Sequence, residues 1–71
     1  MATSMKFKVG AKIKELRQKK GYTQQELADL SELEYKYIQR IEGKNPPNIG
    51  IETLEKIAKV FKISASKLLD F

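Results

Sequence analysis

The chain has 71 residues, a formal net charge of +5 at pH 7, and neither cysteine nor histidine. This length suits one domain with a single core, and the missing residue types exclude disulfides, thiolate or imidazole metal sites and histidine acid–base catalysis. No apolar run approaches the ~20 residues of a membrane span, and the start MATSMKFK lacks the apolar region of a secretory signal, so we expect a cytoplasmic protein without membrane association.

The first predicted helix begins at about Phe7 or Lys8 and ends at Lys20. Its apolar residues follow helical spacing, its last lysines suit the negative end of the helix dipole, and Gly21 suits a left-handed turn that ends it. Residues 1–6 show no pattern, and we expect a disordered or tag-derived start followed by one domain over residues 7–71. The apolar positions are Val9, Ile13 and Leu16.

This first segment is also strongly basic. Residues 1–20 carry seven basic side chains and one acidic side chain, giving +6, whereas residues 21–71 carry seven basic and eight acidic side chains, giving −1. A basic segment indicates a polyanionic partner such as nucleic acid. Lysines that only solvate an exposed helix face would give the same pattern, so charge alone does not decide between the two readings.

The stretch from Thr23 to Glu42 predicts two short helices. Thr23 and Glu26 have the spacing of a capping box, so the second helix should begin at Gln24. The helical pattern breaks near Ser31 and then resumes in a third helix. Two short helices joined by about three or four residues have the geometry of a helix-turn-helix. The expected core positions are Leu27, Leu33, Ile38 and Ile41.

Two further helices are expected after a loop at residues 43–50. Its Asn45-Pro46-Pro47 segment forbids helix, because proline donates no N–H and disfavours α conformation in the residue before it. The fourth helix should begin at Ile51, and Ser64 can cap the fifth. No segment alternates like a strand, so the sequence predicts an all-α fold. Apolar pairs at staple spacing bracket four of these starts: Tyr22/Leu27, Leu33/Ile38, Ile49/Leu54 and Ile63/Leu68.

Three segments, in order, resemble the lambda-repressor-like (Xre/Cro) family of helix-turn-helix DNA-binding domains. They are IKELRQKKGYTQQELA, YIQRIEGK and NPPNIGIETLEKIAKVFKISASKLL, and they lie within residues 9–69. The resemblance implies a compact five-helix DNA-binding domain, with the helix-turn-helix at helices two and three. It also implies a protein that is usually dimeric and acts in transcription.

The exposed face of the third helix is the candidate reader of DNA bases. A helix fits the major groove, and side chains at steps of three and four share one face. Arginine and lysine suit guanine, whereas tyrosine can bond a base or phosphate or pack on a thymine methyl. The alternative for each is a solvated residue or a phosphate contact. The resemblance places base readers at Glu34, Tyr35, Lys36 and Arg40, with Gln39 adjacent.

Contacts to the DNA backbone are expected at the start of the second helix. Its unpaired N–H groups and positive dipole end attract phosphate, and Gln24 can add its amide while Thr23 caps the helix. Both residues could instead only start the helix, and the two roles are compatible. Lys44, Asn45 and Asn48 in the following loop are further phosphate candidates. Such contacts set register and affinity rather than sequence preference.

The resemblance also assigns a structural ion pair and exposes two departures from the family. Arg17 and Glu42 match an ion pair that joins the first and third helices. Glu32 stands where the family commonly has glycine, and Glu34 stands where Ser, Thr or Asp usually caps the third helix. With Asp29, these carboxylates put negative charge near the expected phosphates, although Glu34 could also accept a hydrogen bond from cytosine.

The sequence is therefore read as a sequence-specific DNA-binding transcriptional regulator, a repressor or autoregulator. It would bind double-stranded DNA at a palindromic operator as a homodimer, with recognition helices about 34 Å apart. The alternative is a helix-turn-helix protein-interaction module or an antitoxin-like partner-binding protein. No catalytic residue, metal site, cofactor or small-molecule effector is indicated. Candidates for the dimer surface, which could instead complete the monomer core, are Ile63, Leu69 and Phe71.

Overall fold

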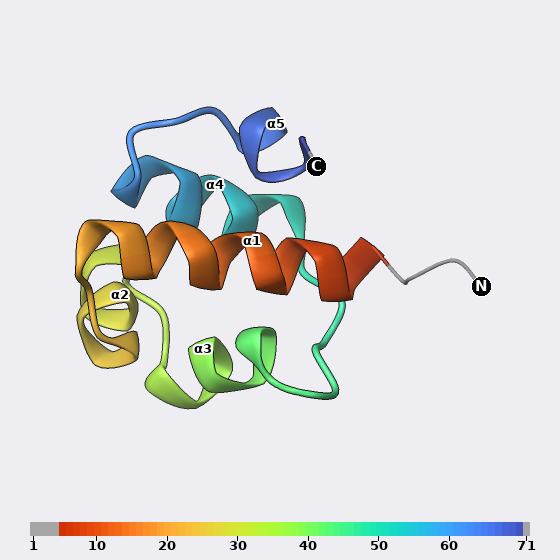
Figure 1. The fold of residues 1–71 in the computed structure, drawn as a ribbon, viewed down its shortest axis with the longest axis horizontal. Helices are drawn as coiled ribbons and strands as arrows, with labels where there is room; N and C mark the ends of the chain where they lie inside the picture. The colour runs from red at the N-terminus through yellow and green to blue at the C-terminus, as the bar shows by residue number, and fades with distance from the viewer. Residues whose placement is uncertain (1–4, 71) are drawn as a thin grey trace.

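The computed structural model describes residues 5–70, and within that range it contains five helices and no strand (Figure 1). The all-α prediction is therefore confirmed. No helix in the described range is long and apolar enough to cross a membrane. The helices are α1 (Met5–Lys20), α2 (Gln24–Ser31), α3 (Tyr35–Glu42), α4 (Ile51–Val60) and α5 (Ala65–Leu68).

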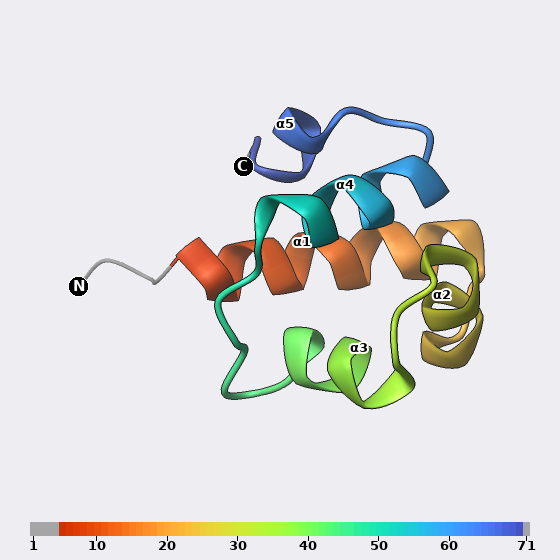
Figure 2. The ribbon, with the colours of Figure 1, turned by 180° about the vertical axis from the view of Figure 1, so that it is seen from behind.

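Helix α1 runs through the middle of the molecule and organises the others around it. Figure 1, and Figure 2 from behind, show α3 on one side of α1 and α4 with α5 on the other, while α2 lies across the end of α1. Helix α3 packs against both α1 and α2, and α4 packs against α2 and α5. The arrangement leaves the outer face of α3 uncovered by any described helix.

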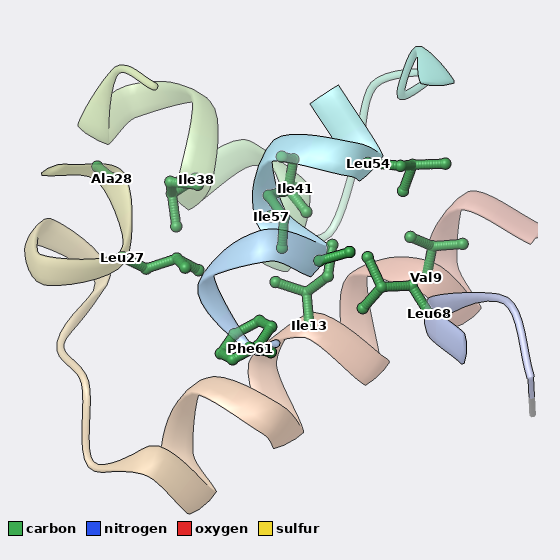
Figure 3. Close-up of a cluster of buried hydrophobic side chains, with 11 residues drawn as sticks. Val9, Ile13, Leu27, Ala28, Ile38, Ile41, Leu54, Ile57, Phe61 and Leu68 are labelled. Atoms are coloured by element: carbon green, nitrogen blue, oxygen red, sulfur yellow. The ribbon is translucent and has the colours of Figure 1, made fainter. Parts of the chain in front are cut away.

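The core is one cluster to which all five helices contribute (Figure 3). Of the expected core positions, Leu27, Ile38 and Ile41 are buried, whereas Leu33 is half-buried at the edge of the cluster. Burial of such aliphatic side chains stabilises the fold by about 1.5–3 kcal/mol each. The buried apolar residues are Val9, Ile13, Leu27, Ala28, Ile38, Ile41, Leu54, Ile57, Ala58, Phe61 and Leu68.

Helix α1 begins earlier than expected. Met5 and Lys6 are helical, so the helix starts before the expected Phe7 or Lys8, and residues 1–4 of the expected irregular start lie outside the described residues. Met5 lines a hollow with Val9 and Leu69. The additional helical residues at the start of α1 therefore lie beside the end of α5, and no local capping signal predicts this arrangement.

Gly10 allows α1 and α3 to approach closely. A β-carbon at this position would overlap the carbonyl oxygen of Ile41 and lie 3.3 Å from its carbonyl carbon. Glycine inside a helix normally costs about 0.5–1 kcal/mol relative to alanine. Here the missing side chain is what lets the two helix backbones touch.

The helix ends follow the sequence signals unevenly. Gly21 has φ +76° and ends α1 as expected, and α4 begins at Ile51. Ser64 occupies the N-cap position of α5 but makes no capping bond, because its hydroxyl lies 2.9 Å from that of Ser66. Two residues other than glycine take left-handed backbone in the described range, Glu32 with φ +59° and Lys62 with φ +58°.

The candidate dimer residues separate into two kinds. Ile63 is partly buried against the core, so it completes the monomer at least in part. Leu69 remains 42% exposed beyond α5. Phe71 lies outside the described residues.

Candidate nucleic-acid interface

The start of α2 is built by a complete capping box. The Glu26 N–H donates to the Thr23 hydroxyl at 3.0 Å, and the Thr23 N–H donates to the Glu26 carboxylate at 2.8 Å. The N–H groups of Gln24 and Gln25 belong to the same first turn and have no intrahelical acceptor. This end of α2 therefore presents backbone donors and the positive end of a helix dipole, which together favour an anion.

Arg17, Glu42 and Gln24 form a network that joins α1, α3 and α2. The Arg17 guanidinium donates two hydrogen bonds to the Glu42 carboxylate, at 2.8 and 2.9 Å, and a third to the Tyr22 carbonyl at 2.8 Å. Gln24 donates its amide to the same carboxylate at 3.1 Å. The Arg17–Glu42 ion pair that the resemblance implied is thus present, and it holds the start of α2 beside the end of α3.

This ion pair is largely withdrawn from water. The Arg17 side chain is 11% exposed and that of Glu42 is 2% exposed. Hydrogen bonding to Glu42 raises the pKa of the Arg17 guanidinium above its ordinary value, against the opposing effect of desolvation. Arg17 is therefore charged throughout the accessible pH range, and its partner stabilises that charge.

The outer face of α3 carries the residues expected to read bases. Tyr35 is 40% exposed, and Lys36, Gln39 and Arg40 are also exposed. The Gln39 amide donates to the Tyr35 hydroxyl at 3.1 Å, so these two side chains lie along one face. Glu34 stands exposed at the N-cap position of α3 and makes no side-chain capping bond. The helix therefore starts without the hydrogen bond that Ser, Thr or Asp would supply.

Acidic and basic side chains share a shallow hollow at the start of α3. Lys36 and Arg40 line it together with Glu32 and Glu34. The two carboxylates reduce the positive potential that a phosphate would meet there. Glu32 comes into this position through the left-handed turn between α2 and α3.

The loop candidates divide between two places. Lys44 and Asn45 are exposed directly after the end of α3. Asn48 instead lines the hollow that contains Met5 and Leu69, so the structure does not group it with the α3 face. In the described range, no cluster of three or more metal-ligating side chains occurs.

Sequence reasoning missed two polar contacts near this face. The Gln24–Glu42 bond joins residues 18 positions apart and has no local signature. Gln25 donates its amide to Asp29 at 2.9 Å, and their spacing of four residues on a helix could have revealed that pair. The second contact leaves the Asp29 carboxylate partly satisfied by its own helix.

Comparison with known proteins agrees with this architecture. A helix-turn-helix family description matches residues 13–68. The transcriptional regulator SinR of Bacillus subtilis is 37% identical over 62 residues, which cover 87% of this chain and 56% of SinR, and SinR of Bacillus licheniformis is 36% identical over the same length. The chain thus spans little more than half the length of these relatives.

Solved structures show the same fold. A crystal structure of SinR in complex with DNA has a TM-score of 0.81 and 37% identity, covering 87% of this chain and 98% of that one. The restriction–modification controller protein C.AhdI from Aeromonas hydrophila has a TM-score of 0.82 and 32% identity, covering 89% of this chain and 94% of that one. With the match over residues 13–68, these similarities show that the chain belongs to the helix-turn-helix family, in its lambda-repressor-like (Xre/Cro) group.

Proposed function

We propose that this chain is a sequence-specific DNA-binding transcriptional regulator that places α3 in the major groove of double-stranded DNA. The observation that carries the proposal is the uncovered polar face of α3, which lies beside the capped start of α2. SinR, to which the chain is 37% identical, has been crystallised with DNA. A helix with exposed arginine, lysine, glutamine and tyrosine fits the major groove in width and in hydrogen-bonding chemistry.

Within this proposal, base reading is assigned to α3. Arg40 and Lys36 can donate to guanine O6 and N7. Tyr35 accepts a hydrogen bond from Gln39, so its own hydroxyl proton remains available for a base or a phosphate. Glu34 can accept from a cytosine amino group.

Phosphate contacts are assigned to the start of α2 and to the loop after α3. One N–H of the Gln24 amide is directed to Glu42, which orients the amide and leaves its second N–H for a phosphate. Thr23 uses its hydroxyl as the cap acceptor, and its neighbours' backbone N–H groups point out of the helix end. Lys44 and Asn45 extend the contact beyond α3.

We further infer repression or autoregulation by a homodimer on a palindromic operator. Two copies related by a two-fold axis would place their α3 helices about 34 Å apart, one turn of DNA. The relatives that support this reading are a transcriptional regulator and a restriction–modification controller. A cytoplasmic location follows from the proposed DNA partner, and no enzymatic activity is inferred.

A specific observation favours one alternative, a module that binds a partner protein, as an antitoxin does. Glu32 and Glu34 share the hollow with Lys36 and Arg40, which weakens attraction for phosphate. A solved structure of a complex between SinR and the SinI protein is also similar to this chain, with 37% identity. Under this alternative the α3 face would bind protein, and affinity for duplex DNA would be absent even at low salt.

The test begins by selecting bound duplexes from a random pool, which reports operator sequence, symmetry and half-site spacing together. Affinities for the selected duplex and for a random duplex are then measured over a salt series. Arg40→Ala should lose roughly 1–3 kcal/mol on the selected duplex and little on the random one. Gln24→Ala should weaken both duplexes by a similar factor, because phosphate contacts carry no sequence information.

Lys67→Ala is the matched control, because Lys67 is an exposed lysine on α5, away from the proposed interface. It should bind both duplexes like the parent. A parent chain that binds neither duplex at low salt would refute the proposed function. So would Arg40→Ala and Gln24→Ala variants that both match the parent on both duplexes.

A further inference from the structure

A shallow groove lies between the end of α2 and the end of α4. Tyr22, Leu30 and Val60 supply its apolar lining, and Lys56, Lys59 and Lys62 supply positive charge from α4 and the turn that follows. In Figure 1 the two helix ends meet beside the end of α1, with α4 on the opposite side of α1 from α3. We call this surface the α2/α4 groove.

Leu30 is the unusual apolar residue of the groove. Its side chain is 55% exposed, although it sits in a helix whose neighbouring Leu27 and Ala28 are completely buried. Tyr22 and Val60 are half-buried against the core beside it. An exposed leucine between two partly covered apolar side chains forms a surface that an apolar side chain of a partner can occupy.

The charge of the groove is strongly one-sided. Three lysines line it against a single carboxylate, that of Glu32. Among the residues that the structure describes, none of these four groups takes part in an ion pair. The lysines can therefore bind carboxylates of a partner, and Lys56 and Lys59 also line a neighbouring hollow with Glu52 and Glu55. Charge complementarity of this kind orients a partner and speeds its association more than it adds affinity.

Backbone conformation points to the same place. Glu32 and Lys62 are the two residues other than glycine with positive φ in the described range, and both line the groove. Lys62 follows α4, where the Ile63 N–H bonds back to Ala58 at 3.1 Å, a helix end at which glycine is the common residue. Residues held in a strained backbone conformation cluster at functional sites, so these two charged side chains indicate a function for the groove.

We propose that the α2/α4 groove binds an acidic segment of another protein, with an apolar side chain against Leu30 and carboxylates against Lys56, Lys59 and Lys62. Duplex DNA fits the groove less well. A phosphate backbone offers no apolar group that could pack against Leu30. Glu32 lines both the groove and the α3 hollow, so its negative charge separates the lysines of the groove from Lys36 and Arg40. The proposal goes beyond DNA binding and does not depend on it.

The test uses the full chain labelled with ¹⁵N and a synthetic peptide with one leucine flanked on both sides by aspartate and glutamate. One control peptide replaces the leucine by serine, and another replaces the acidic residues by lysine. The acidic peptide should give saturable amide shifts at Leu30, Glu32, Lys59 and Lys62, and its affinity should fall as salt rises. Removing its leucine should weaken binding about tenfold, and reversing its charge should abolish binding.

Three variants separate a binding surface from a merely structural one. Leu30→Ser should weaken the peptide about tenfold, while Lys62→Gly should weaken it about threefold without lowering the unfolding midpoint, because glycine adopts the left-handed turn more easily. Lys67→Ala, an exposed lysine outside the groove, should bind the peptide like the parent. All three should keep the parent's affinity for DNA.

Three results would overturn the proposal. The first is shifts that fail to saturate or that spread over the lysines of α1. The second is a Lys59→Ala variant that binds DNA more weakly than the parent and with a smaller salt dependence, which would assign the groove to nucleic acid. The third is self-association of the parent that Leu30→Ser removes, which would assign the groove to a second copy of this chain.

Discussion

Gly10→Ala is the substitution that most directly tests how α3 is held. On propensity alone alanine should stabilise α1 by about 0.5–1 kcal/mol, since glycine loses more backbone entropy in a helix. In this fold, however, the added β-carbon would overlap the Ile41 carbonyl oxygen and lie 4.0 Å from the Glu42 α-carbon. The neighbouring atoms belong to backbone and cannot swing aside, so the two helices must separate.

The size of the effect follows from that separation. Moving α3 away by ~1 Å forfeits roughly a quarter to a half of the dispersion energy at the contact. Ile13, Ile38 and Ile41 are all nearly or completely buried there, and overpacking of such a core costs about 1–3 kcal/mol. After the gain in helix propensity is subtracted, about 0–2.5 kcal/mol of destabilisation remains, and we expect a value of about 1 kcal/mol for Gly10→Ala. A loss of that size should lower the unfolding midpoint by roughly 4–8 °C.

The assay is denaturant and thermal unfolding followed by circular dichroism, with affinity for the selected duplex measured on the same samples. Ala11→Gly is the control, because Ala11 is an exposed neighbour in the same helix. It should lose only the propensity term of about 0.5–1 kcal/mol. A Gly10→Ala variant more stable than the parent would refute the close approach of α1 and α3, since propensity would then be the sole effect.

Two further substitutions test the polar contacts around α3. Glu42→Gln should cost about 2–3 kcal/mol of unfolding free energy, because it leaves the guanidinium of Arg17 largely buried without its counter-charge. The control Glu55→Gln, on the exposed face of α4, should change stability little. Equal stability of the two variants in chemical unfolding would contradict this prediction. Glu32→Gly should stabilise the fold by about 0.5–1 kcal/mol in the same measurement, since glycine adopts the left-handed backbone of this position without strain. Glu32→Gln should not stabilise the fold. A Glu32→Gly variant less stable than the parent would show that the turn is unstrained.

The helix starts that could be predicted are those with strong local chemistry. α2 begins at Gln24 and α4 at Ile51, where a capping box and a proline-rich loop act within a few residues. Ser64 shows the limit of such signals, because its hydroxyl pairs with the side chain of Ser66 rather than with a backbone N–H of α5. Lys62 also escaped prediction, since lysine rarely adopts left-handed backbone and nothing local marks it.

Contacts between distant segments could not be predicted from spacing. Arg17 and Glu42 lie 25 positions apart, and only the family resemblance paired them. In the sequence alone, Gly10 only indicates a position that weakens the helix. Its role, which is to let the backbones of α1 and α3 approach, becomes evident only when α3 is packed against it. The exposed face of α3 was expected from periodicity, whereas the assignment of its residues to bases and phosphates remains a proposal.

The inner face of α3 fixes the position of the helix, whereas its outer face is exposed. α2 and α3 have eight residues each, which is below the about 12–15 residues at which isolated helices become even marginally stable in water. For α3, stability must therefore come from its inner face, through Ile38, Ile41 and the bonds of Glu42 to Arg17 and Gln24. The outer residues contribute little to folding, so they can be chosen for recognition alone. A change in DNA specificity and a change in stability should consequently arise from different faces of the same helix.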